Sequence, residues 1–465
     1  MDWRAADVSG RPRGKGIEGM RLKAGVAQID ISPDQGLELA GYPHYPRNNT
    51  GVHDPLIAAC LYLNDGETEL AMVTLDLLFF SKRHVAEVRR RVQAVCGLKA
   101  DHLMISCSHT HSGPWAAGRL DVESLEAGKE QPHAYVEALI ERITRIVAQA
   151  KNECVEATLA YGCEICGAEQ GVGGNRTMRG GPHDPLVSVF SVKDKSDRVR
   201  GVFTNYTLHP TFIHEWSNVV TADYPGYFRK EIQKHAPDAV FGFAQGASGN
   251  QSSRYYRTGE SFDEAERVGA LLGQAAWRVV ERGEYRDEIT LSVASSTIEP
   301  IIRVFGEEAE LEERVAKDRA IYEDLYARYG SSKNRDEYYL WQNANLKLLG
   351  SEDQLGYVKM QNRGVQIELL RDERPAEIQA FRIGSCCVIG LPGEAFVEYS
   401  LYLKAMSGYP MTVVNTLANG CMPGYLITPQ GMSEGGYEAD TSMLDVAFGR
   451  KLIDCALDTV ARLSD

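Results

Sequence analysis

Long hydrophobic runs are missing from this sequence of 465 residues. No stretch approaches the ~20 uninterrupted apolar residues that a helix needs to cross a bilayer, so we expect no membrane span. The first residues carry charges but no apolar segment, which argues against a secretory signal. We therefore expect residues 1–19 to form a poorly ordered tail and the protein to be cytoplasmic.

An excess of positive charge is also missing. The 50 lysine and arginine residues are outnumbered by 64 aspartate and glutamate residues, and the net charge is −14. Nucleic-acid binding requires a clustered positive field, so we expect no nucleic-acid partner. A small-molecule substrate is the partner that we expect instead.

The ten cysteines lack the dense spacing of a disulfide framework, and their scatter is typical of a reduced compartment. Cys163 and Cys166 form a CxxC pair, but a zinc ribbon would need a second pair, and the sequence has none at suitable spacing. The pair follows a strand-like stretch and leads toward a loop, unlike a thioredoxin-type site. We interpret it as structural.

Short apolar runs rich in β-branched residues alternate with segments of helical periodicity. The predicted strands are 26–31, 56–63, 70–77, 102–106, 186–192, 202–207, 239–244, 289–298, 378–383, 386–391 and 411–416. The predicted helices are 82–96, 135–150, 224–235, 264–282 and 395–406. This alternation predicts an α/β fold with a mixed β-sheet core flanked by helices, in one domain over residues 20–465.

One segment, from residue 307 to about 349, is densely charged and helical in pattern, with a break near Gly330. We interpret it as a helical hairpin inserted between sheet elements. Its tyrosines and Trp341 form an aromatic face. The hairpin is therefore either a solvated surface element, or a lid or a contact between subunits of a homo-oligomer.

Two histidines follow the predicted strand 102–106 in the stretch Ser108-His109-Thr110-His111-Ser112-Gly113-Pro114. In extended geometry residues i and i+2 point to the same side, so both imidazoles can face one cleft. His109 is a candidate zinc ligand, and His111 is a candidate ligand or proton donor.

Two further candidates also follow strands. His209 comes after the strand 202–207, and Glu394 comes after the strand 386–391, at the predicted start of a helix. Strand ends in α/β folds are where ligands gather, and two histidines with one glutamate match a catalytic zinc set with an open position for water. Taken singly, each residue is better explained as a buried, satisfied histidine or as a glutamate favoured by the helix dipole.

The order of motifs resembles the neutral/alkaline non-lysosomal ceramidase family, whose members are zinc-dependent amidases. The motifs are Ala24-Gly25 with Asp30-Ile31-Ser32-Pro33, Ala40-Gly41-Tyr42, the His109 stretch, Gly174-Asn175-Arg176, the His209 strand end, Gly249-Asn250, and Leu391-Pro392-Gly393-Glu394. The resemblance runs from Ala24 to about Thr441.

The resemblance implies one Zn²⁺ per chain, held by His109, His209, Glu394 and Tyr425. It also implies that Tyr437, which follows Tyr425 at the family's interval of twelve residues, acts on the transition state. By the same resemblance Ser252 and Asn175 belong to the substrate pocket. From zinc chemistry we expect His111 to protonate the leaving group, and the fork-shaped Arg176 to orient a substrate oxygen.

The chain departs from the family at two points. Trp115 stands where the signature has glycine, which puts a bulky group at the pocket rim, and we expect no C-terminal immunoglobulin-like domain. With no membrane-docking stretch to meet a bilayer, we expect a smaller and more polar amide than ceramide. The alternatives are a zinc-dependent lyase, esterase or lactonase on a sugar-acid substrate, and a non-catalytic binding protein.

Overall fold

The computed structural model describes residues 21–42, 44–116, 133–332 and 334–464. The predicted tail, residues 1–19, lies outside these ranges. A mixed sheet of eight strands forms the centre of the molecule, in the order β4-β3-β2-β1-β5-β7-β8-β9. Its strands are β1 (Lys23–Asp30), β2 (Ile57–Asn64), β3 (Glu69–Leu75), β4 (Leu103–Cys107), β5 (Val155–Ile165), β7 (Leu186–Asp194), β8 (Val199–Tyr206) and β9 (Val240–Gln245). Two neighbouring pairs, β3–β4 and β8–β9, are parallel, and the others are antiparallel.

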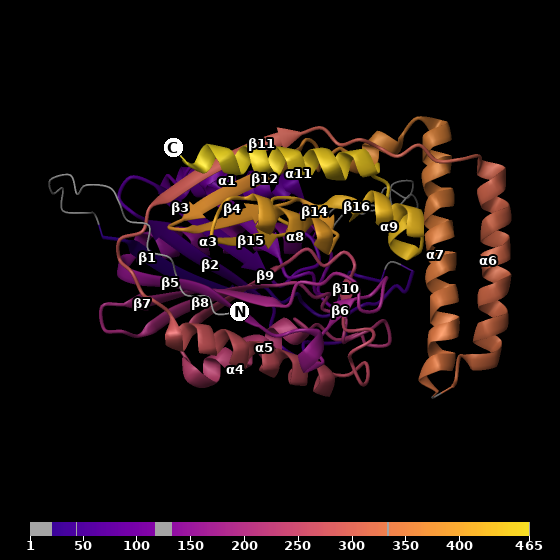
Figure 1. Ribbon diagram of the computed structural model, residues 1–465, viewed down its shortest axis with the longest axis horizontal. Helices are drawn as coiled ribbons and strands as arrows, with labels where there is room; N and C mark the ends of the chain where they lie inside the picture. Colours follow the sequence, from indigo (N-terminus) through magenta and orange to yellow (C-terminus); the bar gives the residue numbers. More distant parts are fainter. Residues whose placement is uncertain (1–20, 43, 117–132, 333, 465) are drawn as a thin grey trace.

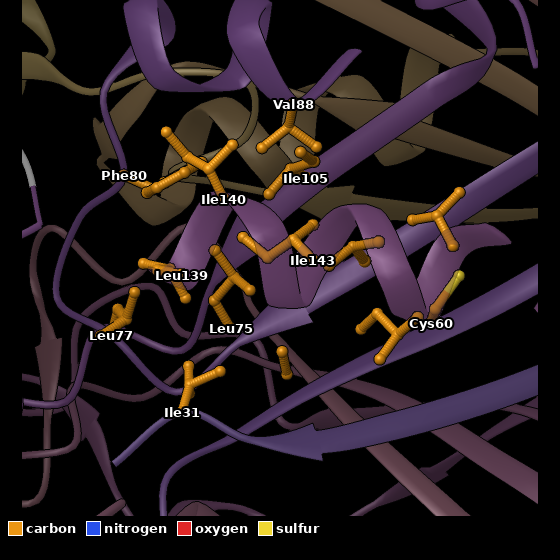
Figure 2. Close-up of a cluster of buried hydrophobic side chains, with 14 of the residues drawn as sticks. Ile31, Cys60, Leu75, Leu77, Phe80, Val88, Ile105, Leu139, Ile140 and Ile143 are labelled. Atoms are coloured by element: carbon orange, nitrogen blue, oxygen red, sulfur yellow. The ribbon is translucent and has the colours of Figure 1, made fainter. Parts of the chain in front are cut away.

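Four helices cover one face of this sheet: α1 (Lys82–Cys96) and α3 (His133–Asn152) over one half, α4 (Tyr224–His235) and α5 (Phe262–Arg282) over the other. The sequence sets the ends of α1, because the Ser81 side chain accepts a hydrogen bond from the His84 N–H and Gly97 adopts the left-handed conformation. Val85, Val88 and Val92, at spacings of three and four, are buried against β-strand residues such as Ile105, whereas Val95 is exposed (Figure 2).

A second sheet packs on the opposite face of the first. It runs β11 (Leu291–Ile298), β12 (Ala376–Ile383), β13 (Cys386–Gly390), β15 (Met411–Asn415). Phe190 and Phe203 of the first sheet meet Phe381 and Val388 of the second in one core cluster. Helices α8 (Val397–Met406) and α11 (Val446–Ala461) cover the outer face of the second sheet, so the layers are helix, sheet, sheet and helix (Figure 1). The predicted α/β class is confirmed.

The predicted helical hairpin is present as α6 (Glu308–Tyr329) and α7 (Arg335–Arg363). The two helices stand side by side at one end of the molecule, in the orange part of the ribbon (Figure 1). α7 continues well past residue 349, where the prediction ended. Its later turns pack on the short helix α10 (Tyr437–Asp440).

Two local predictions need correction. β5 was expected to end before the CxxC pair, but it includes Cys163, which is exposed, whereas Cys166 is buried. All ten cysteines are free. The helix predicted from residue 395 begins at Val397, because residues 393–395 form a strand of their own, β14 (Gly393–Ala395). The small strands were not predicted, since short segments lack a clear period. α11 was also not predicted, although its buried positions Phe448, Leu452, Ala456 and Val460 follow a helical spacing.

The large sheet is curved, so that β9 contacts β3 and β4 although it lies at the opposite edge. Gly242 of β9 makes this approach possible: a Cβ atom there would lie 2.3 Å from the Phe203 ring and 3.0 Å from the Thr74 hydroxyl of β3. The curvature brings the carboxyl ends of β4 and β8 together, and the candidate histidines follow these two strands.

We predict that Gly242→Ala lowers the free energy of unfolding by about 1–3 kcal/mol, because the methyl group would overpack the curved sheet. Urea denaturation would measure the change. Gly259→Ala is the matched control, since no heavy atom lies within 4 Å of a Cβ atom at that position. Equal midpoints for the two variants would contradict this account of the curvature.

Candidate metal centre and substrate pocket

His109 is held at the end of β4 by its own backbone. Its N–H donates to the Leu77 carbonyl over 2.8 Å, and its φ of 69° lies in the left-handed region. A non-glycine residue in that region costs of order 1–3 kcal/mol, and such strain clusters at functional sites. The imidazole is buried, with Nδ1 3.3 Å from the Leu78 carbonyl oxygen.

His209 and Glu394 reach the same point from other elements. His209 follows β8, and its Nδ1 lies 2.8 Å from the Ser248 carbonyl oxygen. Glu394 lies in β14 and not at a helix start, which corrects the prediction. β14 pairs in parallel with β16 (Met422–Leu426), in a register that sets Glu394 opposite Tyr425.

Three side-chain atoms converge at this point. His109 Nε2 lies 3.1 Å from His209 Nε2, and Glu394 Oε2 lies 3.2 Å from each of them. Tetrahedral zinc with bonds of about 2.0–2.1 Å would separate its ligand atoms by roughly 3.3 Å. The spacing of the three atoms therefore fits a metal ion bound between them.

The imidazole protons of His109 and His209 lie on the nitrogen atoms that point away from this cluster. Carbonyl oxygens only accept hydrogen bonds, so each Nδ1 carries the ring proton and each Nε2 presents a lone pair. Burial lowers the pKa of His209 to about 3, which keeps this ring neutral at pH 7. Glu394 Oε2 is buried without a hydrogen-bond donor. Three acceptor atoms in contact need a cation, so the residues present fit a metal ion.

His111 stands beside this group. Its Nε2 lies 3.4 Å from His109 Nε2, and His109, His111 and His209 together form a cluster that could hold a metal. The Tyr42 ring packs against His111 at 5.0 Å between ring centroids. Gly41 allows this packing, because a Cβ atom there would lie 2.6 Å from the His111 ring. Burial lowers the pKa of His111 well below its usual range, so the ring is neutral.

Arg176 connects the remaining predicted residues. Its Nε donates to Glu438 over 2.7 Å, and its Nη2 donates to the Gly249 carbonyl over 2.8 Å and to the Tyr425 hydroxyl over 3.0 Å. The Tyr425 and Tyr437 rings lie 6.2 Å apart. Burial raises the pKa of both tyrosines, so both hydroxyls keep their protons at neutral pH.

A cavity with about 890 Å³ of open space, its mouth included, contains this group of residues. His111, Arg176, His209, Ser252, Tyr425 and Tyr437 line it. Ser252 lies in β10 (Gln251–Ser252), paired with β6 (Gly174–Asn175). Asn175 and Trp115 are not among the lining residues. The Asn175 carboxamide bonds to Thr177, Met178 and Pro182 of its own loop, which carries Arg176.

The sequence reasoning missed one whole wall of this pocket. α7 supplies Gln342, Asn345, Leu346 and Leu349, and the pocket also contains Tyr42, His214, Glu215, Arg254 and Arg257. The four α7 residues follow the i, i+3, i+4, i+7 spacing of a helix face, which was readable from the sequence. Their position over the histidines was not, because it depends on contacts between distant elements.

No helix among the described residues is both long and apolar enough to cross a membrane.

The arrangement of sheets and the buried histidine group define an α/β protein with a potential metal centre. The sequence model of the neutral/alkaline non-lysosomal ceramidase family, N-terminal part, matches residues 22–266. Since this is more than half of the chain, the chain belongs to that family. The match includes His109, His111, Arg176, His209 and Ser252, but not Glu394, Tyr425 or Tyr437.

Two solved structures share the fold. The neutral ceramidase from Pseudomonas aeruginosa superimposes with a TM-score of 0.72 at 18% identity, over 96% of this chain and 75% of the other. A structure described as ceramidase complexed with C2 gives a TM-score of 0.69 at 17% identity, with the same coverage. The resemblance expected from the motifs is confirmed.

We predict that Glu394→Gln stabilises the metal-free protein by about 1 kcal/mol, because the amide can donate a hydrogen bond to an imidazole Nε2 that otherwise faces a carboxylate. Thermal unfolding in a chelator would measure this. With saturating metal the order should reverse, and a variant less stable than the parent in both conditions would contradict the proton assignment.

Proposed function

We propose that this protein is a zinc-dependent hydrolase that cleaves an amide (N-acyl) bond of a small, fairly polar substrate. The observation that carries the proposal is the convergence of His109 Nε2, His209 Nε2 and Glu394 Oε2, of which His209 lines the pocket. The family is the second support, since its description is that of ceramidases, which are amide hydrolases.

Zinc is the metal that the donor set favours. Two imidazole nitrogens and a carboxylate oxygen form a three-residue set that is common in catalytic zinc sites. We assign Tyr425 as the fourth ligand, because it pairs with Glu394 across β14 and β16 and lines the same pocket. Burial raises the pKa of Tyr425 and the Arg176 guanidinium beside its hydroxyl only partly opposes that rise, so a bound cation would be needed to hold the phenolate.

When bound, zinc would supply a nucleophilic hydroxide at neutral pH and polarise the scissile carbonyl. The chain's own groups divide the remaining work. Neutral His111 can take up a proton through an imidazole nitrogen and pass it to the leaving amine. The Tyr437 hydroxyl stays protonated because burial raises its pKa, so it can donate a hydrogen bond to the developing oxyanion.

We propose a positioning role for Arg176 beside the expected orientation of a substrate oxygen. Because its guanidinium is committed to Glu438, Gly249 and Tyr425, we assign it to holding these groups in place, with its charge close to the substrate oxygen. Its fork geometry allows three partners at once.

The pocket lining favours a polar substrate over ceramide. Arg254, Arg257 and Glu215 line it with the α7 amides, beside two leucines and four tyrosines. Placing two long aliphatic chains against these groups would remove their charges from water, which costs free energy even for a paired group such as Arg257 with Glu260. We also propose a cytoplasmic location, which the ten free cysteines support.

We predict that His109→Ala and Glu394→Ala lose both zinc and activity, because each removes a ligand of the site. Metal analysis of the purified variants, with assay on short N-acyl amides, would test this. Tyr402→Phe, at an exposed position on α8, is the control and should keep both the zinc content and the activity of the parent protein. Full zinc occupancy in His109→Ala/His209→Ala would falsify the site.

A second candidate is a lyase, esterase or lactonase that acts on a sugar-acid substrate at the same site. Three arginines, Arg176, Arg254 and Arg257, line the pocket and favour a substrate with a carboxylate.

Turnover in H₂¹⁸O separates hydrolysis, whether by an amidase, an esterase or a lactonase, from elimination by a lyase. We predict one ¹⁸O atom in the product acid, because a hydrolase adds water across the cleaved bond. Mass spectrometry of the product would detect it. An unlabelled product with a new carbon–carbon double bond would identify a lyase instead.

A further inference from the structure

α10 is too short to hold its own conformation. It has four residues, Tyr437 to Asp440, and a single helical turn is unstable in isolation. Yet it presents Tyr437 to the pocket and Glu438 to Arg176. The position of Tyr437 must therefore be set by the elements that contact the C-terminal end of α10.

Asp440 makes the strongest contacts between α10 and the hairpin. Its carboxylate accepts hydrogen bonds from Arg314 of α6 and from Gln354 Nε2 of α7, the latter over 2.9 Å. The approach of α7 is close, since a Cβ atom on Gly350 would lie 2.6 Å from Asp440 Cβ. Asp440 is buried, so its charge depends on these partners and not on water.

Backbone contacts fix the rest of the turn. Arg303 Nη1 donates to the Ala439 carbonyl over 2.7 Å, and the Tyr357 hydroxyl of α7 donates to the Thr441 carbonyl over 3.3 Å. Thr441 in turn donates its backbone N–H to the Tyr437 carbonyl over 2.9 Å. A displacement of Asp440 would therefore pass along one turn to Tyr437.

Arg314 is itself oriented across the hairpin. Its Nε lies 3.5 Å from Asp318 one turn later in α6, and Lys347 of α7 lies 3.4 Å from the same carboxylate. Arg314 Nη1 also donates to Gln354 Oε1 of α7 over 3.1 Å, so this buried aspartate and Gln354 together orient the guanidinium toward Asp440. The hairpin thus does more than cover the pocket: one face of α7 lines it with residues 342–349, and the following turns hold α10.

We propose that Arg314 is a positioning residue that acts through Asp440 to hold Tyr437 at the pocket. The inference rests on the proposed function only for the role of Tyr437. Arg314 is not itself among the lining residues of the pocket, so its effect should be on turnover and not on substrate affinity.

The test compares Arg314→Met with Arg319→Met in the zinc-loaded protein. Arg319 also joins α6 to α7, through an exposed ion pair with Glu352, and it is a matched control for the stability of the hairpin. We expect Arg314→Met to lower kcat about 10- to 100-fold, with KM within about twofold and unchanged zinc content. Arg314→Lys should restore part of the loss, and Arg319→Met should resemble the parent protein.

A double-mutant cycle with Tyr437→Phe identifies the route. Tyr437→Phe should lower kcat about 10²-fold or more with zinc still bound. If Arg314 acts through Tyr437, Arg314→Met should slow Tyr437→Phe by less than threefold. An equal loss in both backgrounds would overturn the proposal.

Hydrogen–deuterium exchange gives a readout that needs no substrate. The peptide over residues 436–444 should exchange faster in Arg314→Met than in Arg319→Met, while α11 stays protected in both. Gln354→Leu, which removes one hydrogen bond to Asp440 and one from Arg314, should act in the same direction if Arg314→Met does not fold. Unchanged exchange at 436–444 overturns the inference, whereas faster exchange in a protein that cleaves no amide would support it and reject the proposed function.

Discussion

Three proton-free acceptor atoms in contact are the constraint around which this protein is arranged. The Nε2 atoms of His109 and His209 and the Oε2 atom of Glu394 lie 3.1–3.2 Å apart in a buried site. Without a cation their lone pairs oppose one another, so the fold must hold them by other means. The curved sheet, the left-handed backbone at His109 and the β14–β16 pairing each supply part of that hold.

Much of the architecture could be predicted from local patterns. α1 and α4 have the predicted ends, because capping residues and a regular apolar spacing coincide there. The two-residue strands β6 and β10 and the three-residue β14 could not be predicted, because they exist only through pairing with distant segments. β14 explains why Glu394 was wrongly predicted at a helix start. Its three residues precede α8, and so short a strand has no recognisable hydrophobic period.

The residues of the candidate site also fall into those that local patterns predict and those that depend on distant contacts. Histidines at strand ends are visible in a sequence, so His109, His111 and His209 could be found from spacing and strand prediction. The partners of Arg176 could not, since Gly249, Tyr425 and Glu438 come from three separate regions. The α7 wall is an intermediate case: its spacing was readable, but a helix face says nothing about which surface it covers.

The shared fold does not decide the substrate, because one fold serves many reactions. Here the pocket has two sources: strand ends supply the candidate ligands, and α7 supplies the facing wall. Side chains at 342, 345, 346 and 349 can therefore change which substrate fits without touching the ligands. The backbone of α7 has less freedom, because Gly350 and Gln354 contact Asp440 and so bear on Tyr437. Substitutions of these α7 side chains should therefore change substrate selectivity. A shift of the α7 backbone should instead change turnover, because it would displace Tyr437.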